Sequence, residues 1–439
     1  MTLTTYRLNC DVWCLLSEFA GGGLAVNREK EFNLYDIIVI GGGPAGSFVS
    51  SELSSSGFKV ITIEEHEQIG KPSHCTGILG EDLFQQFNIP SNSIIEELPY
   101  FKIFSPKGDY FYLPGKIKAY IVDRAAFDVD LSELSIRRGT HYELCAKALK
   151  IENLDKKVIV HIEKNKKTSK IEGKFCVIAT GAMSNLPYES GISRPRAFYK
   201  SVQTDIEVSD LKGAEVYTGK FVAPGSFAYA VATNGKIAKA GVITRVKAKV
   251  CFENLLKSDL LKDRLIGVLE SVKYRRIPAG VPKDTCVNRI AAVGDAAAQI
   301  KTTTGGGVYY GLLCGSILVD TLKKAYNGKD FNLSKAADYD KKWKHELGAE
   351  LQAGFLLRNF FETVDDHYVN KIFDLLKTPQ VKKIIDHASH YERHKDLLIA
   401  VLKNSKARKL AFEIIKKNLP KKKFFTNIIT YVTSLADLL

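Results

Sequence analysis

The cysteines of this sequence form no recognisable pattern. Eight occur, all isolated except Cys10 and Cys14, and none is part of a C-x-x-C pair. This arrangement excludes a disulfide framework and the usual spacings of zinc and iron–sulfur sites. We therefore expect mostly buried, apolar cysteines in a reducing cytosol, and no bound metal.

The sequence also lacks a convincing targeting signal. The apolar stretch at the N-terminus is interrupted by Asp11 and Glu18, and almost no basic residue precedes it. Residues 1–33 carry no motif. We interpret them as an N-terminal extension, either an added element or the product of a start codon placed too far upstream. The uncharged run 302–319 opens with threonines and glycines, which favours a ligand-binding loop before a buried helix over a membrane span.

Charge of one sign is in excess. The chain has 63 lysines and arginines against 49 acidic residues, a formal net charge of +14. Such a balance favours anionic partners, and the absence of a nucleic-acid-binding motif favours a membrane surface over nucleic acid. Segment 416–425 joins five lysines to two phenylalanines, which suits an anionic membrane face, although a solvated face is the alternative. We expect a cytoplasmic protein that associates peripherally with the membrane.

What is present is a dinucleotide-binding pattern near the start of the chain. Four apolar residues lead into Gly41, Gly43 and Gly46, which have the spacing G-x-G-x-x-G. Gly41 permits a tight turn, Gly43 lets the backbone approach a pyrophosphate, and Gly46 lets the next helix pack on the strand. A second strand follows and ends in Glu64, an acid placed to hold ribose hydroxyls. The alternative is a glycine turn in an ordinary α/β protein.

The strands predicted later in the chain indicate that the cofactor-binding domain is interrupted by an insertion and then continues. Further buried strands are expected at 175–179 and 289–293, separated by mainly β structure at 201–243. A helix is predicted at 250–272, and helices are predicted from Val308 almost to the end. One cofactor domain with a β insertion accounts for this order.

A second cofactor signal lies at Gly294-Asp295-Ala296. It resembles the second fingerprint of glutathione-reductase-type flavoproteins, in which an aspartate at a strand end binds the ribityl chain. The alternative is a helix N-cap aspartate. Three glycines at 305–307 then precede a predicted helix, where backbone N–H groups can reach a flavin or pyrophosphate unobstructed. The two motifs together indicate FAD.

The predicted fold class is α/β, with a glutathione-reductase-type Rossmann FAD-binding domain, an inserted mainly β substrate domain and a C-terminal helical region. The predicted boundaries are 1–33 for the extension, 34–200 and 274–320 for the discontinuous FAD-binding domain, 201–273 for the substrate-binding insertion, and 321–439 for the helical region.

Several segments between residue 35 and about residue 360 resemble the geranylgeranyl reductase family, flavoenzymes that saturate isoprenoid chains. The segments are 41–46 with Glu64, G-K-P-S-H-C-T-G at 70–77, V-D-R-A-A-F-D at 122–128, G-D-A-A at 294–297, T-T-G-G-G-V-Y-Y at 303–310, and the helix from Tyr339 to Arg358. The resemblance implies that Cys75 lies beside the flavin ring. It also implies contacts to FAD from Ala45, Glu64, Cys75, Thr76, Gly77, Arg124, Ala148, Asp295, Gly307 and Val308.

The sequence departs from the family in the substrate sheet. Archaeal members typically show P-x-x-Y-x-W-x-F-P, whereas 224–232 keeps the proline but has Phe227 and Tyr229 at the aromatic positions and Val231-Ala232 at the end. We expect Phe227 and Tyr229 to line the substrate path, with plain strand core as the alternative. The smaller side chains predict a reshaped tunnel and a different prenyl preference, such as a quinone tail.

The resemblance implies an oxidoreductase acting on CH–CH bonds, whose substrate is an isoprenoid lipid or prenylquinone. The protein must then supply a proton, for which His74, Cys75 and Tyr229 are the candidates, with Cys75 the catalytic candidate beside the flavin. No second G-x-G-x-x-G marks a nicotinamide domain, so the electron donor is NAD(P)H in transient contact or ferredoxin. Two alternatives are a flavin-dependent aromatic-ring monooxygenase, whose usual D-G is here Thr180-Gly181, and a flavin-binding membrane-associated protein that has lost catalysis.

Overall fold

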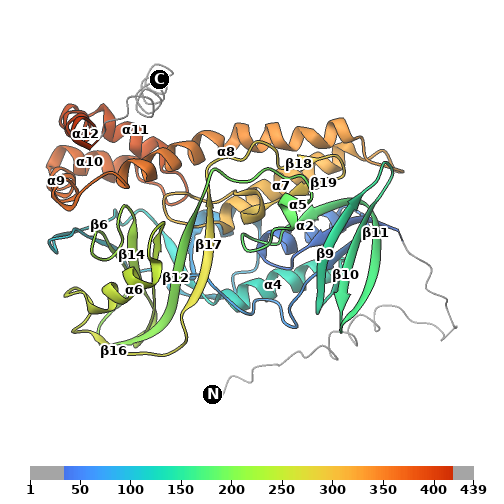
Figure 1. Ribbon diagram of the computed structural model, residues 1–439, viewed down its shortest axis with the longest axis horizontal. Helices are drawn as coiled ribbons and strands as arrows, with labels where there is room; N and C mark the ends of the chain where they lie inside the picture. Colours follow the sequence, from blue (N-terminus) through green and yellow to red (C-terminus); the bar gives the residue numbers. More distant parts are fainter. Residues whose placement is uncertain (1–33, 419–439) are drawn as a thin grey trace.

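The computed structural model describes residues 34–418. The predictions for the N-terminal extension and for the lysine-rich segment beyond residue 418 lie outside these residues. Two large sheets occupy opposite ends of the molecule, and helices run along one side of both (Figure 1).

The first sheet is built around β1 (Tyr35–Ile40), whose last four residues are buried. β1 pairs in parallel with β2 (Val60–Ile63) and with β11 (Lys167–Ile178). β19 (Ile290–Ala292) pairs in parallel with β11 although more than a hundred residues separate them. The remaining strands are β8 (His141–Glu143), β9 (Ala146–Asn153), β10 (Val158–Lys164) and β18 (Cys286–Val287). Parallel pairing brings the carboxyl ends of β1, β2, β11 and β19 to one edge of the sheet, where ligands bind in such folds.

Four helices pack beside this sheet. They are α2 (Pro44–Ser55), α4 (Arg124–Arg137), α7 (Val308–Ala325) and the long α8 (Leu333–Phe361). Pro44 stands in the first turn of α2, where its missing N–H costs nothing. The Asp123 carboxylate starts α4 by accepting hydrogen bonds from the backbone N–H groups of Ala125 and Ala126. Trp343 of α8 is fully buried and donates its indole N–H to Thr285 Oγ1 at 2.8 Å, which anchors α8 to the core.

The second sheet is mainly antiparallel and carries α6 (Ala248–Lys257). Its strands are β5 (Phe101–Phe104), β6 (Tyr110–Tyr112), β12 (Ala197–Val208), β13 (Ala214–Tyr217), β14 (Phe227–Asn234), β15 (Ile237–Thr244), β16 (Leu265–Val268) and β17 (Lys273–Ala279). β5 pairs with β13, so residues from the first part of the predicted FAD-binding domain belong to this sheet. The domain boundaries remain a prediction.

The predicted helix at 250–272 is wrong in its second half. α6 ends at Lys257, and 265–268 form β16, which pairs with β12. Half-buried and exposed residues alternate along β16, a period of two that suits a strand at the edge of a sheet and not a helix.

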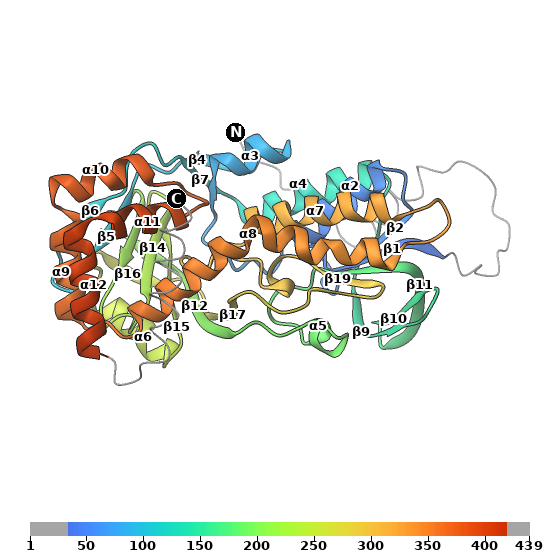
Figure 2. The same ribbon diagram turned by 90° about the horizontal axis from the view of Figure 1, so that it is seen from above.

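A short third sheet joins the two large ones. It consists of β3 (Ile78–Gly80), β7 (Ala119–Val122) and β4 (Ile94–Glu97), with α3 (Glu81–Phe87) alongside; α5 (Leu186–Glu189) and a 3₁₀ turn at Gly294–Ala297 complete this part. The helices predicted after Val308 are observed. α8 extends from the first sheet towards α9 (Asp366–Leu376), α10 (Pro379–Ala388), α11 (Lys395–Lys403) and α12 (Ser405–Asn418), which gather beyond the second sheet (Figure 2). Within residues 34–418, every helix is too short or too polar to cross a membrane.

Candidate functional site

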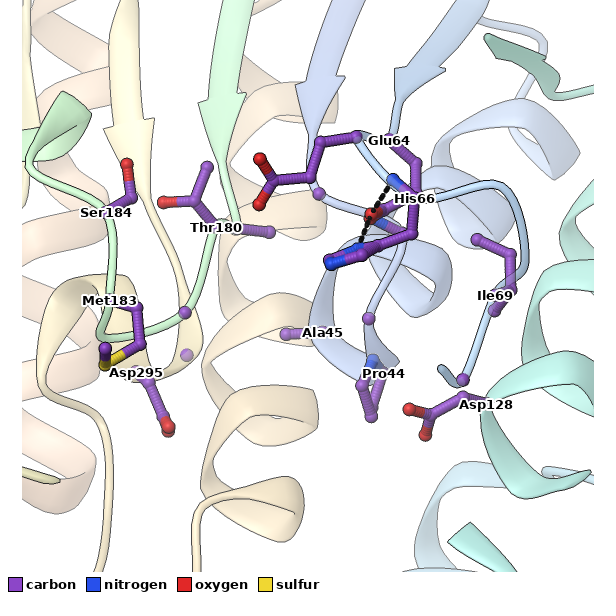
Figure 3. Close-up of a pocket in the computed structure, with 18 of the residues that line it drawn as sticks. Pro44, Ala45, Glu64, His66, Ile69, Asp128, Thr180, Met183, Ser184 and Asp295 are labelled. Atoms are coloured by element: carbon purple, nitrogen blue, oxygen red, sulfur yellow. Dashed lines mark hydrogen bonds and ion pairs between the residues drawn. The ribbon is translucent and has the colours of Figure 1, made fainter. Parts of the chain in front are cut away.

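A cavity of about 550 Å³ lies at the carboxyl edge of the first sheet. Its wall is formed by the residues that follow β1, β2, β11 and β19, together with the turn at 70–75 and the starts of α4 and α7. The close-up shows these segments converging, with Glu64, Asp128, Thr180 and Asp295 around one space (Figure 3). The parallel topology therefore assembles the site from segments far apart in the sequence.

The three predicted glycines have three different environments. Gly41 has φ of +107°, and a Cβ there would lie 2.4 Å from the carbonyl oxygen of Ala179. At Gly46 a Cβ would lie 1.9 Å from the carbonyl oxygen of Gly41, so only glycine lets α2 pack on the turn. Gly43 lines the cavity, and a Cβ there would meet no protein atom within 4 Å. The space beside Gly43 is thus open to a ligand, as a pyrophosphate site requires.

Glu64 is held as an ionised acceptor on the cavity wall. Its carboxylate accepts hydrogen bonds from Gly42 N at 2.7 Å and from the backbone N of His66 at 3.0 Å, and it lies 2.5 Å from His66 Nδ1 (Figure 3). Burial alone would raise the pKa of Glu64, but these partners outweigh it and lower the pKa. The hydrogen bond to Glu64 in turn raises the pKa of His66.

Arg124 and Asp128 form a buried ion pair one turn apart on α4. Their side chains are 11% and 12% exposed, and Arg124 Nη2 lies 2.6 Å from Asp128 Oδ1. Although burial opposes the charge on Arg124, the carboxylate of Asp128 raises its pKa, so the guanidinium stays protonated. Asp295 also lines the cavity, and burial raises its pKa to about 6 while Arg124 opposes the rise.

Three buried polar atoms along the cavity have no hydrogen-bond partner among the described residues. They are Arg124 Nε, His74 Nδ1 and Thr180 Oγ1. Buried polar groups without a partner are uncommon in folded proteins because they lose hydration without compensation. Their position around one cavity fits a polar ligand such as the cofactor that the sequence indicates.

Cys75 lies in a tight turn at the cavity. Gly77, at φ of +83°, directs its N–H to Cys75 Sγ at 3.5 Å, and its carbonyl accepts a hydrogen bond from Val122 of β7 at 2.8 Å. Cys75 lines the cavity, whereas Thr76 and Gly77 are not among its lining residues. The cavity is also lined by Ala45, Ala148, Gly307 and Val308, but not by Gly46. The contacts of these residues with FAD remain a prediction.

Phe227 and Tyr229 lie in a separate apolar cluster, here called the apolar wall. Its buried members are Leu98, Ala119, Ile121, Tyr199, Ala214, Tyr229, Val231, Ile243, Ala279 and Phe355, and the half-buried Phe227 and Tyr391 pack against them. Neither Phe227 nor Tyr229 is among the residues that line the described cavity. Both side chains are therefore packed as strand core in this structure, and their role in lining a substrate path remains a prediction.

Some residues of the site were not anticipated as such. His66, Asp128 and Met183 line the cavity, and Tyr391 enters the apolar wall from the segment between α10 and α11. The sequence could have indicated the ion pair of Asp128 with Arg124, since the two residues are four positions apart on a predicted helix. No sequence pattern marks Tyr391, because its contacts, such as those with Phe101 and Lys301, are with residues far away in the sequence.

Comparisons with known proteins agree with this architecture. Residues 35–216 match the family described as pyridine nucleotide-disulphide oxidoreductase. The digeranylgeranylglycerophospholipid reductase of Methanocaldococcus jannaschii is 27% identical over 79% of this chain and 92% of its own length. The enzyme of the same name from Methanosarcina acetivorans is 26% identical over 85% of this chain and 94% of its own length.

Solved structures show the same fold. A geranylgeranyl bacteriochlorophyll reductase-like protein from Thermoplasma acidophilum superposes with a TM-score of 0.74 at 19% identity, covering 93% of this chain and all of its own. The p-nitrophenol 4-monooxygenase of Pseudomonas putida superposes with a TM-score of 0.64 at 15% identity, covering 88% of this chain and 99% of its own. The predicted fold class is confirmed.

Proposed function

This chain belongs to the geranylgeranyl reductase family, and from that premise we propose that it is an FAD-dependent reductase that saturates isoprenoid double bonds of a membrane lipid or of a quinone side chain. The observation that carries the proposal is the convergence of four parallel strand ends with the Cys75 turn around one cavity. The apolar wall adjoins this turn, since Gln203 of β12 hydrogen-bonds the Cys75 carbonyl and Tyr229 of the wall hydrogen-bonds Gln203.

The residues of the cavity fit FAD. The open space at Gly43 and the start of α2 suit a pyrophosphate, because backbone N–H groups and the helix dipole favour anions there. The ionised Glu64 suits the ribose of an adenosine half. Asp295, at the end of β19, suits the ribityl chain, and Arg124 suits the anionic end of the flavin.

Bound flavin in its reduced form supplies a hydride to one carbon of an alkene. The protein must keep water away from that carbon, orient an apolar chain and provide a proton to the other carbon. An isoprenoid chain offers few polar groups, so its affinity must come from apolar burial. The apolar wall is the surface of suitable character beside the Cys75 turn.

Cys75 is the proposed proton donor among the three candidates. Burial, assisted by the nearby cationic side chains, lowers the pKa of His74 to about 4, so its ring is neutral at pH 7. Burial raises the pKa of Tyr229, and its hydroxyl is already donated to Gln203. Cys75, the remaining candidate, lies on the cavity wall, and its thiol donates no hydrogen bond among the described residues.

The partners follow from this assignment. The substrate is an isoprenoid lipid or prenylquinone, and the electron donor is NAD(P)H or ferredoxin. We place the protein at the cytoplasmic membrane surface, held peripherally by its excess of basic residues. Sedimentation with liposomes of anionic and of neutral lipids tests this placement, and equal binding to both would contradict it.

Product analysis tests the function. The purified protein should release FAD and not FMN on denaturation. When reduced with dithionite and incubated with polar lipid and quinone extracts, it should yield products heavier by two hydrogens per double bond in mass spectrometry. Unchanged extracts in the presence of full FAD occupancy would instead support a flavin-binding protein without this catalysis.

A hydroxylase is the second candidate, because the p-nitrophenol monooxygenase shares the fold. Thr180 and Gly181 line the cavity where the D-G motif of that class is expected, so an acidic group is missing at that point. Incorporation of an oxygen atom from air into the product would favour this candidate over the reductase.

A further inference from the structure

Three residues form a row across neighbouring strands of the second sheet. In the strand register Tyr229 of β14 stands opposite Gly241 of β15, and Gly241 stands opposite Gln203 of β12. Side chains in such a row point to the same face of the sheet. The central position has no side chain, so the two outer ones can approach each other across it.

The glycine is what makes this approach possible. A Cβ at Gly241 would lie 2.4 Å from Tyr229 Oη and 2.5 Å from Tyr229 Cζ, so the tyrosine ring occupies the space above the glycine. Tyr229 thereby reaches past β15 and donates a hydrogen bond to Gln203 Oε1 at 2.9 Å. Tyr229 and Gln203 are only 6% and 8% exposed.

The other end of the Gln203 amide reaches the Cys75 turn. Gln203 Nε2 donates to the carbonyl oxygen of Cys75 at 3.4 Å, which is longer than the roughly 2.7–3.2 Å usual for such a bond. The orientation of the amide is fixed by chemistry, because a carbonyl oxygen can only accept and must therefore face the NH₂ group. The amide oxygen is then left for the tyrosine hydroxyl.

We propose that Gln203 is a positioning residue that holds the Cys75 turn at the flavin cavity, and that Tyr229, through Gly241, holds Gln203. The catalytic role of Cys75 rests on the proposed function, whereas the hydrogen bonds that hold the Cys75 turn do not depend on it. Tyr229 then has two roles, because its side chain belongs to the apolar wall and its hydroxyl also donates a hydrogen bond to Gln203. The wall and the Cys75 turn are thereby joined by two consecutive hydrogen bonds.

The test measures the alkylation rate of Cys75 by iodoacetamide in FAD-loaded protein, followed on the Cys75 peptide by mass spectrometry. Gln203→Met keeps the volume and removes both hydrogen bonds. Tyr229→Phe removes only the hydroxyl, and this variant keeps the test available if the first does not fold. Thr204→Val is the matched control, because the Thr204 hydroxyl on the same strand donates to the carbonyl of Glu270 at 2.8 Å and not to the Cys75 turn.

We expect Cys75 to react about fivefold faster in Gln203→Met, equivalent to about 1 kcal/mol and the usual worth of one hydrogen bond. The increase should be about twofold in Tyr229→Phe, and Thr204→Val should match the wild type. A rate within the error of wild type in both Gln203→Met and Tyr229→Phe, at normal FAD content, would overturn the proposal.

A second readout separates this proposal from the function on which it rests. With a geranylgeranyl phospholipid as substrate, Gln203→Met should lower kcat and leave KM unchanged, because the reacting group is displaced while the apolar wall remains. If the wild type reduces no isoprenoid lipid but Cys75 still reacts faster in Gln203→Met, the function fails and the positioning role stands. A loss of kcat/KM in Gln203→Met that comes only from a higher KM, with kcat unchanged, would count against a positioning role of Gln203.

Discussion

The flavin cavity and the apolar wall are built on opposite principles. The cavity is made of backbone turns at strand ends and holds about 550 Å³ of free space, and three buried polar atoms along it have no partner within residues 34–418. The wall is made of side chains from β7, β12, β13, β14, β15, β17 and α8, together with Leu98 and the segment after α10, packed against one another. A polar cofactor can bind to hydrogen-bonding groups that the fold already holds in place. An apolar chain must instead be enclosed by apolar side chains, which pack against one another when no ligand is bound.

The largest effect is expected at Gly43. Gly43→Val should leave the fold intact, because φ there is −72° and the added atoms enter the cavity and not the protein. Flavin content after purification should fall below about a tenth of wild type, because the valine side chain would occupy the space in which the backbone approaches the pyrophosphate. Gly115→Val, at another open glycine away from the cavity, is the control. Normal flavin content in a folded Gly43→Val protein would remove the glycine turn from the cofactor site.

A substitution in the apolar wall should lower the stability of the fold and leave the flavin content unchanged. Tyr391 stacks near Phe101 at 5.8 Å and lies under Lys301, whose Nζ is 4.1 Å from the ring centroid. Tyr391→Ala should lower the free energy of unfolding by about 2 kcal/mol, because the cavity left in the wall cannot close completely. Flavin content should not change. Tyr274→Ala, at an exposed tyrosine, should cost almost nothing in the same denaturant titration, and flavin loss in Tyr391→Ala would mean that the two regions are not separable.

These two regions were not equally predictable. The glycine turn, Glu64 and Asp295 follow from local spacing, because each stands at the end of a strand whose neighbours are also recognisable. The wall depends on pairing between distant segments, such as β5 with β13 and Tyr391 with the strand residues around Tyr229. The helix wrongly extended through 265–268 has the same cause, since that segment is a strand only because β12 is there to pair with it.

Asp295 should lower the stability of the protein without flavin while it contributes to flavin binding. Burial raises its pKa from 3.8 to about 6, so its carboxyl is charged and destabilising at pH 7 in protein without flavin. Asp295→Asn should stabilise the apoprotein at pH 7 by on the order of 2 kcal/mol and weaken flavin retention. The stability gain should shrink as the pH is lowered from about 7 to about 4, where the wild-type carboxyl is also neutral. A gain independent of pH in thermal unfolding would contradict this account.

The smallest effect is expected for His66. Its raised pKa stabilises the fold below the ordinary value of 6.5, and this contribution is lost as the pH rises through the higher value. Glu64, whose pKa is lowered, contributes above 4.5 and loses its contribution in acid. Between pH about 6 and about 8 the melting temperature of wild type should therefore fall more than that of His66→Asn. The difference should be small because the His66 side chain is 46% exposed, and identical pH slopes would show that the pair contributes nothing.

One measurement addresses the central claim, that the two regions meet to reduce an isoprenoid double bond. The FAD-loaded protein is reduced, kept free of oxygen and mixed with a geranylgeranyl phospholipid or a prenylquinone, while flavin absorbance and product mass are followed in the same sample. We predict that the flavin is reoxidised without oxygen and that one double bond gains two hydrogens for each flavin. A flavin that stays reduced until air is admitted, with oxygen then found in the product, would contradict the account.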